Sequence, residues 1–179
     1  MISKAALAAF FCLAASVAWA QSAVTPGGDK AVSIAPTVQN AAYSASNSLG
    51  GLQTLSAFRL SAHSGIFNRL WLGSKGGSTV AMTVYVFDAN PTNSTCTDKT
   101  AFSLASADLA KLAFAPFVIT PAAPQGATQT VGEFSTVASL ANADSPQTTN
   151  IYLCIVANAS VTPASTSDIV GALLLSQNN

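Results

Sequence analysis

Histidine, the usual base in nucleophilic catalysis, occurs once in this chain, as His63. A Ser-His-Asp site would need His63 beside one of the many serines, and the G-x-S-x-G turn that presents such a serine is absent. His63 lies between Ser61 and Gly65 in a short stretch of small and polar residues, which is typical of a solvated turn. The sequence therefore predicts no catalytic triad.

Acidic side chains are the second group that could do chemistry, and the chain has seven of them. A glycoside hydrolase needs two carboxyl groups about 5 to 10 Å apart. The spacing along the chain does not single out such a pair. A hydrolase with dispersed carboxylates therefore remains as an alternative, and its candidate acids are Asp88, Asp98, Asp108 and Glu133.

The loop at residues 88–98 gathers side-chain oxygens of the kind that Ca²⁺ prefers. The D-x-[DN]-x-[DN]-G order of a calcium loop is absent, and Asx turns explain the same residues without a metal. Zinc is disfavoured because only one histidine is present. We predict no metal and no cofactor, although the oxygen ligands of this loop are Asp88, Asn90, Asn93, Thr95 and Asp98.

Residues 73–79, Gly-Ser-Lys-Gly-Gly-Ser-Thr, superficially resemble a phosphate-binding loop. The G-x-x-x-x-G-K-[ST] spacing is missing, and a strand pattern follows instead of a helix whose N-terminus could face an anion. We interpret the segment as a hairpin turn.

The N-terminus has the pattern of an export signal. Lys4 precedes an apolar run from Ala5 to Ala18, and small residues flank Trp19 before Gln21. This is the positive, apolar and A-x-A order of a secretory signal peptide, which predicts cleavage between Ala20 and Gln21. The run is shorter than the roughly 20 residues that cross a bilayer comfortably. We expect a secreted or periplasmic protein with no integral membrane segment after cleavage.

Cysteine usage agrees with export. Cleavage would remove Cys12 and leave Cys96 and Cys154, which most often form a disulfide in an oxidising compartment. Such a bridge would close a loop of about 58 residues and add roughly 4 kcal/mol to stability in the chain-entropy model. Two separate buried thiols are the alternative.

The composition limits the classes of partner. The chain is 50% apolar and only 8% charged, with a net charge of zero, whereas about 25% charged residues is typical. Nucleic-acid binding needs clustered Lys and Arg, and the few basic residues here are scattered. We expect no nucleic-acid partner and a neutral surface rich in Ser, Thr, Asn and Gln.

Short apolar segments separated by Pro, Gly, Asn and Ser, with little helical periodicity, predict an antiparallel β-sandwich, jelly-roll-like, in one domain over 49–179. Residues 1–20 are the signal peptide, and 21–48 read as a flexible arm with an edge strand near 31–38. Residues 79–87 alternate with bulky groups on both faces, so this strand should be central. One helical turn is expected at Ser106–Lys111, with Ser106 as its cap. The other predicted strands cover 66–72, 112–119, 128–137, 151–157 and 169–176.

Aromatic side chains are the candidates for binding a carbohydrate. Tyr43, Trp71 and Tyr152 could serve this role if they were exposed. Trp71 and Tyr152 lie inside apolar segments, where packing in the core is the more common use.

Two stretches resemble a known group of proteins. They are Phe87-Asp88-Ala89-Asn90-Pro91-Thr92, continued by Ser94-Thr95-Cys96-Thr97-Asp98, and Ala107-Asp108-Leu109-Ala110-Lys111. The pattern is similar to that of small, uncharacterised structural proteins of tailed phages and prophages, over about residues 43–177. The resemblance implies a β domain that assembles or decorates a particle, with no active site to transfer. The signal peptide and Cys96 depart from that group's pattern.

These observations favour an exported, non-enzymatic structural protein that works through protein–protein contacts, either with a partner protein or by self-assembly. The first alternative is a carbohydrate- or surface-binding adhesion module. The second is the hydrolase with dispersed carboxylates.

Overall fold

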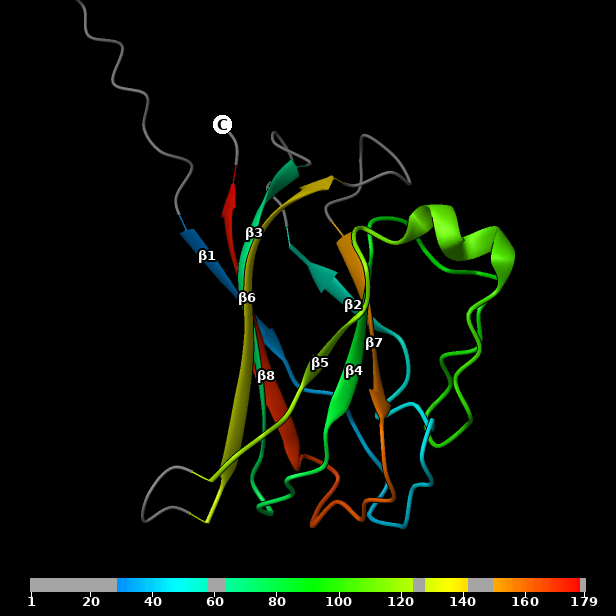
Figure 1. The fold of residues 1–179 in the computed structure, drawn as a ribbon, viewed down its shortest axis with the longest axis vertical. Helices are drawn as coiled ribbons and strands as arrows, with labels where there is room; N and C mark the ends of the chain where they lie inside the picture. The colour runs from blue at the N-terminus through cyan, green and yellow to red at the C-terminus, as the bar shows by residue number, and fades with distance from the viewer. Residues whose placement is uncertain (1–28, 58–63, 124–127, 142–149, 178–179) are drawn as a thin grey trace, which may run out of the picture.

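The computed structural model describes residues 29–57, 64–123, 128–141 and 150–177. Eight strands and one short 3₁₀ helix form this part of the chain (Figure 1). In chain order they are β1 (Asp29–Ile34), β2 (Gln53–Ser56), β3 (Ser64–Ser74), β4 (Met82–Phe87), η1 (Ser106–Lys111), β5 (Phe117–Ile119), β6 (Thr130–Ala141), β7 (Asn150–Ala157) and β8 (Ile169–Gln177).

The strands form two four-stranded antiparallel sheets, ordered β1-β8-β3-β6 and β2-β7-β4-β5. Strand β1 pairs with β8, β2 with β7, β3 with β6 and β4 with β5. The pairings are nested, so the chain is in effect one long hairpin of eight strands rolled into two layers. This is the strand order of a jelly roll, and the predicted antiparallel β-sandwich is confirmed.

The core lies between the two sheets and follows the alternation of each strand. Leu70 and Leu72 of β3 and Val84 of β4 are fully buried there, because every second side chain of a strand points to the same face. On the side where β5 meets β6, the rings of Phe117 and Phe134 stack with their centroids 3.9 Å apart. The aromatic rings fill the space between the sheets on this side, where the described residues form one bridge, from Ala122 after β5 to Val131 of β6.

Strand β4 confirms the prediction of a central strand, because it lies between β7 and β5. The bulky groups on its two faces serve two separate clusters. Val84 and Val86 enter the main core, whereas Tyr85 and Phe87 pack into a second cluster on the outer side of the sheet.

The edge strand expected near 31–38 is present as β1, but the expectation that residues 21–48 are otherwise a flexible arm is wrong for the described residues 29–48. Strand β1 pairs with β8 over its whole length at an edge of the sheet. Ile34, Val38 and Tyr43 are each 1% exposed, and the Val38 amide donates to the Thr166 carbonyl at 3.1 Å. A few widely spaced apolar residues thus anchor a segment whose composition is otherwise that of a loop. Residues 1–28, including the predicted cleavage site Ala20–Gln21, lie outside the described residues.

Two local predictions also need correction. Residues 73–79 do not form a hairpin turn, because β3 and β4 belong to different sheets and the segment crosses from one to the other. The helical turn at Ser106–Lys111 is confirmed, but Ala105 is its N-cap and no side chain caps it. The next strand is shorter than the predicted 112–119, since its ladder with β4 covers only Phe117–Ile119, and Leu112 forms an isolated bridge with Phe87.

Candidate functional site: the outer faces of the two sheets

Four of the described carboxylates occupy separate places in the fold. Asp98, Asp108, Glu133 and Asp168 accept hydrogen bonds from four sets of residues that share no member. These contacts do not join any two of the four into an acid–base pair of the kind a glycosidase needs. In the part of the chain that the structure describes, no cluster of three or more His, Cys, Asp or Glu could hold a metal ion.

Asp108 is the anchor of the loop between β4 and β5. It is fully buried and accepts hydrogen bonds from the Asn93 amide and the Ser94 hydroxyl, each at 2.8 Å. It also forms an ion pair with Lys111 at 3.0 Å. Burial by itself raises the pKa of the Asp108 carboxyl, but the hydrogen bonds from Lys111, Ser94 and Asn93 outweigh it and hold the pKa well below the ordinary value. Asp108, which the sequence offered as a candidate acid of a hydrolase, is thus a buried side chain that holds the loop in place.

Asp168 plays the same part at one end of the sandwich. The carboxylate accepts from the Ser74 hydroxyl at 2.9 Å and from the amides of Gly76 and Ala164 at 2.6 and 2.9 Å. A Cβ at Gly76 would lie 2.5 Å from the Ala164 side chain, so the glycine allows the β3–β4 crossing to approach this carboxylate. The glycine-rich segment therefore wraps an internal acid rather than a phosphate.

The third carboxylate ties the N-terminal segment to the β4–β5 loop. The Tyr43 hydroxyl donates to Asp98 at 2.8 Å and accepts from the Gln39 amide at 2.6 Å, and the Gly50 amide donates to Asp98 at 2.7 Å. Burial raises the pKa of Tyr43 to about 12, assisted by Asp98 and opposed by the Gln39 amide. Gly50 has a φ of +75°, a conformation that glycine adopts without strain.

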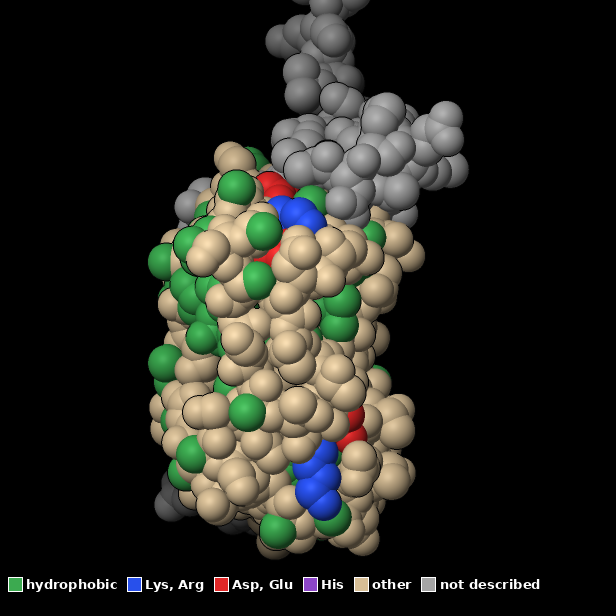
Figure 2. Space-filling model, turned by 90° about the vertical axis from the view of Figure 1, so that its right-hand side faces the viewer, with side chains coloured by type: hydrophobic (Ala, Val, Ile, Leu, Met, Phe, Trp, Pro, Cys, Tyr) green, Lys and Arg blue, Asp and Glu red, His purple; other side chains and the backbone are tan. Residues whose placement is uncertain are grey.

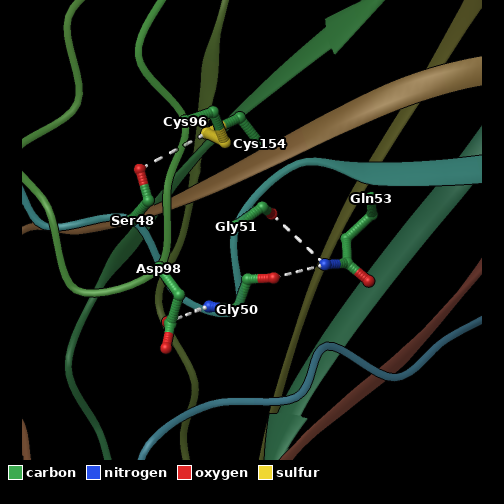
Figure 3. Close-up of a disulfide and its surroundings, with 7 residues drawn as sticks. All are labelled: Ser48, Gly50, Gly51, Gln53, Cys96, Asp98 and Cys154. Carbon is green, nitrogen blue, oxygen red and sulfur yellow. Dashed lines mark hydrogen bonds between the residues drawn. A yellow bond between two sulfur atoms is a disulfide. The ribbon is translucent and has the colours of Figure 1, made fainter.

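The predicted disulfide between Cys96 and Cys154 is present and crosses from this loop to β7, with 6.2 Å between the Cα atoms. Figure 3 shows the bridge beside Ser48, whose hydroxyl lies 3.7 Å from the Cys154 sulfur. In the same view the Gln53 side chain donates to the carbonyls of Gly50 and Gly51. The bridge and the Asp98 contacts thus join three segments distant in sequence, and the Gln53 contacts brace the turn at Gly50 and Gly51 locally.

The fastened loop covers the outer face of the β2-β7-β4-β5 sheet. Beneath it Phe87, Tyr152 and Val156 form a second buried cluster, against which the loop's Phe102, Leu104 and Leu112 pack. The rings of Tyr85 and Phe102 lie 4.3 Å apart. Figure 2 views this side of the molecule, where tan polar and backbone atoms predominate and charged side chains form only small groups.

One shallow hollow opens beside this cover. It has a volume of about 300 Å³, and within it the Thr83 hydroxyl donates to the Asn158 side chain at 2.7 Å. An aromatic floor with hydroxyl and amide groups is the chemistry that binds a sugar ring. Its lining residues are Ser46, Thr83, Tyr85, Phe102, Val156, Ala157 and Asn158.

The outer face of the β1-β8-β3-β6 sheet is different. Trp71 lies between the buried Leu70 and Leu72 of β3, so its half-buried ring points away from the core. It pairs with Ala172 of β8 on one side and Glu133 of β6 on the other. Apolar side chains of β6 and β8 that point to the same side as Trp71 give this face an apolar centre. The centre consists of Trp71, Val131, Val170, Ala172 and Leu174.

Polar groups surround this centre. Arg69 and Glu133, both exposed, form an ion pair at 3.4 Å, and the Asn68 side chain donates to the Ser176 hydroxyl at 2.8 Å. Val131 is 44% exposed. In Figure 1 the described chain outside the strands lies on the other sheet's side or at the ends of the sandwich, so none of it covers this face.

Of the residues that the sequence offered for carbohydrate binding, Tyr43 and Tyr152 are buried and structural, and only Trp71 faces outward. His63 lies outside the described residues. Sequence reasoning missed the Tyr85–Phe102 pair and the outward set around Trp71. The apolar residues at 170, 172 and 174 could have indicated the outward side chains around Trp71. However, the sequence does not distinguish a strand with two apolar faces, one of them exposed, from a strand that is buried on both faces.

Among the described residues, no helix is long and apolar enough to cross a bilayer. Comparison of the chain with protein-family models, with curated proteins and with solved structures gives no match.

Proposed function

We propose that this chain is an exported, non-enzymatic structural protein that assembles through contacts between copies, and that the outer face of the β1-β8-β3-β6 sheet is its assembly surface. The observation that carries the proposal is the uncovered face itself, with Trp71 at its centre. The other sheet has its outer face covered by a loop that is fastened at three points.

The layout of this face is that of a protein interface. Interface centres are apolar and enriched in aromatic residues, and their rims are polar. Tryptophan is among the residues that most often dominate binding energy. The centre here holds Trp71, Leu174 and Val131, and the rim holds the Arg69–Glu133 ion pair. With a net charge of zero, copies of the chain do not repel one another as they approach.

The resemblance to phage structural proteins supports the same class, although the motif residues have a structural part here. Phe87 and Asp108 are buried beneath or within the loop, and Cys96 forms the bridge. Jelly rolls occur both in viral capsids and in lectins, so the fold by itself favours neither assembly nor glycan binding.

Tryptophan fluorescence tests the proposal directly. The chain has two tryptophans, Trp19 and Trp71, so residues 21–179 contain Trp71 alone. If copies associate through this face, the Trp71 emission maximum shifts to shorter wavelength as the protein is concentrated. Trp71→Ser leaves residues 21–179 without tryptophan, so its association is followed by light scattering. It should lose the contacts made through this face, whereas Val118→Ser, at a valine 53% exposed on the other sheet, should keep them. Emission that does not change with concentration would contradict the proposal.

Carbohydrate binding is a second candidate, favoured by the hollow beside Tyr85 and Phe102. Oligosaccharide titration followed by NMR of the purified protein tests it. Shifts confined to Tyr85, Thr83 and Asn158, lost in Tyr85→Ala, would support a glycan-binding module. A sugar-dependent change in Trp71 emission without any dependence on protein concentration would replace the assembly proposal by glycan binding at the uncovered face.

A further inference from the structure

The sandwich has four edge strands, β1 and β6 in one sheet and β2 and β5 in the other. An edge strand presents a row of backbone N–H and C=O groups without ladder partners, which invites another chain to pair. Proteins protect such edges with short strands, prolines, charges or covering segments. The four edges of this molecule are protected to different degrees.

Three of the edges are short or blocked. Strand β2 has four residues and β5 has three, and prolines at 116 and 121 flank β5. Strand β1 carries Lys30, whose ammonium donates to the Ser56 carbonyl of β2 at 2.7 Å. This contact ties the β1 and β2 edges together and places a charge on them.

Strand β6 is the longest edge strand, and its second half has the fewest of these protections. Its one charge, Glu133, lies in the first half, and the only irregularity of its pairing with β3 falls between Ser135 and Ala138. It has twelve residues, Thr130–Ala141, and pairs with β3 on one side. Near its start Val131 and Ala122 exchange two backbone hydrogen bonds of 3.0 Å on the other side. From Phe134 to Ala141 no strand among the described residues pairs with that outer side. The segment, Phe-Ser-Thr-Val-Ala-Ser-Leu-Ala, contains no charge and no proline.

We propose that this segment, 134–141, is the pairing edge for a second copy of the chain, with the two β6 strands antiparallel about a two-fold axis. An antiparallel edge is self-complementary under such an axis, so one surface supplies both sides of the contact. The segment holds no charged residue, so pairing brings no like charges together.

The inference rests on the proposed function and names how copies meet. Pairing two β6 edges joins two four-stranded sheets into one continuous sheet. A two-fold axis perpendicular to the sheet keeps both outer faces on the same side, so two Trp71 centres lie on one extended surface. Pairing of the two β6 edges would form a dimer, and contacts between outer faces would join dimers into larger assemblies.

Charge substitution at the edge tests the inference. Ser135 and Ser139 are exposed, so Ser135→Lys with Ser139→Lys places like charges against each other in a paired edge without filling the core. The dissociation constant of the edge contact should rise roughly 100-fold. The matched control is Ser33→Lys, an exposed serine on β1 at the opposite edge of the same sheet, which should leave the contact unchanged.

A rescue experiment separates repulsion from misfolding. A copy with Ser135→Glu and Ser139→Glu should be as weakly associated as the lysine copy, and mixing the two should restore pairing as a mixed dimer, measured by native mass spectrometry. Charged copies that associate as tightly as the unaltered protein, or a mixture without mixed dimers, would overturn the inference.

Combination with Trp71→Ser distinguishes this inference from the proposed function. The edge-charged copy should retain only contacts made by the outer face, Trp71→Ser should retain only the edge pair, and the copy carrying both changes should be monomeric. If the unaltered protein associates and only Trp71→Ser weakens it, the edge inference fails and the proposed function stands. If the unaltered protein is monomeric at every concentration, the proposed function fails and the inference with it.

Discussion

The outer faces of the two sheets both carry apolar side chains, but they differ in whether other parts of the described chain cover them. Both are built from strands with apolar side chains on each side. On the β2-β7-β4-β5 sheet, a loop held by Cys96–Cys154, Asp108 and Asp98 buries the outward residues in a second cluster. On the β1-β8-β3-β6 sheet, the residues around Trp71 have no such cover among the described residues. The disulfide, Asp98 and Asp108 thus hold the cover on one face, and under the proposed function the other face makes the contacts between copies.

The largest effect should come from opening the disulfide. The bridge spans 58 residues, so Cys96→Ala with Cys154→Ala should lower the free energy of unfolding by about 4 kcal/mol in the chain-entropy model. Denaturant unfolding of the oxidised, reduced and substituted proteins measures this. If reduction leaves the unfolding midpoint unchanged, the bridge does not stabilise the cover.

Removing a ring beneath the cover should have the next largest effect. Phe102→Ala deletes the partner of Tyr85 and leaves a space in the second cluster, which should cost about 2 kcal/mol. The comparison is with Val118→Ala at an exposed valine of the same sheet, expected to be nearly neutral. Equal stability of the two variants would show that the loop rests on the sheet without packing against it.

Tyr43 tests the link between the N-terminal segment and the cover. Tyr43→Phe keeps the ring and removes the hydroxyl between Asp98 and the Gln39 amide, at a cost of about 1 to 2 kcal/mol.

The same residue predicts a pH dependence. Folding raises the Tyr43 pKa from 10.0 to about 12, so the folded state binds the proton more tightly. This stability is complete below pH 10 and is lost as the pH rises toward 12. Unfolding followed across this range should show the loss in the unaltered protein and not in Tyr43→Phe; identical pH profiles would contradict the assignment.

The smallest effect on stability should come from the uncovered face. Trp71→Ser removes a ring that packs on one side only, so the free energy of unfolding should change by less than about 1 kcal/mol, while association weakens. Chemical unfolding at low protein concentration, where the protein is monomeric, isolates the first quantity. A loss as large as that of Phe102→Ala would make Trp71 a packing residue and remove the contrast between the faces.

Sequence patterns predicted much of this fold, and the exceptions have physical causes. Alternation over 79–87 predicted β4, and the expected export to an oxidising compartment predicted the Cys96–Cys154 pair. The arm at 29–48 was misjudged because three widely spaced side chains, Ile34, Val38 and Tyr43, supply its anchoring. The internal role of Asp108 depends on Ser94 and Lys111 meeting it from two sides of a loop, which spacing along the chain does not specify.

The outer face of the β1-β8-β3-β6 sheet was harder to predict from the sequence than the fold. Strand β8 reads as a continuous apolar run, and period-two patterns do not say whether a second apolar face is buried or exposed. Which of two such faces receives a covering loop depends on long-range contacts between the β4–β5 loop and β7. The sequence does not predict that β6 is an edge strand, because this depends on the order of the strands in the sheet.

The molar mass of the purified protein, measured by light scattering over a range of concentrations with the disulfide intact, shows whether copies of the chain associate through the outer face. If they do, the mass rises with concentration to a multiple of that of one chain, and it falls in Trp71→Ser. A mass equal to one chain at every concentration, in a protein shown to be folded and oxidised, would contradict the proposed function.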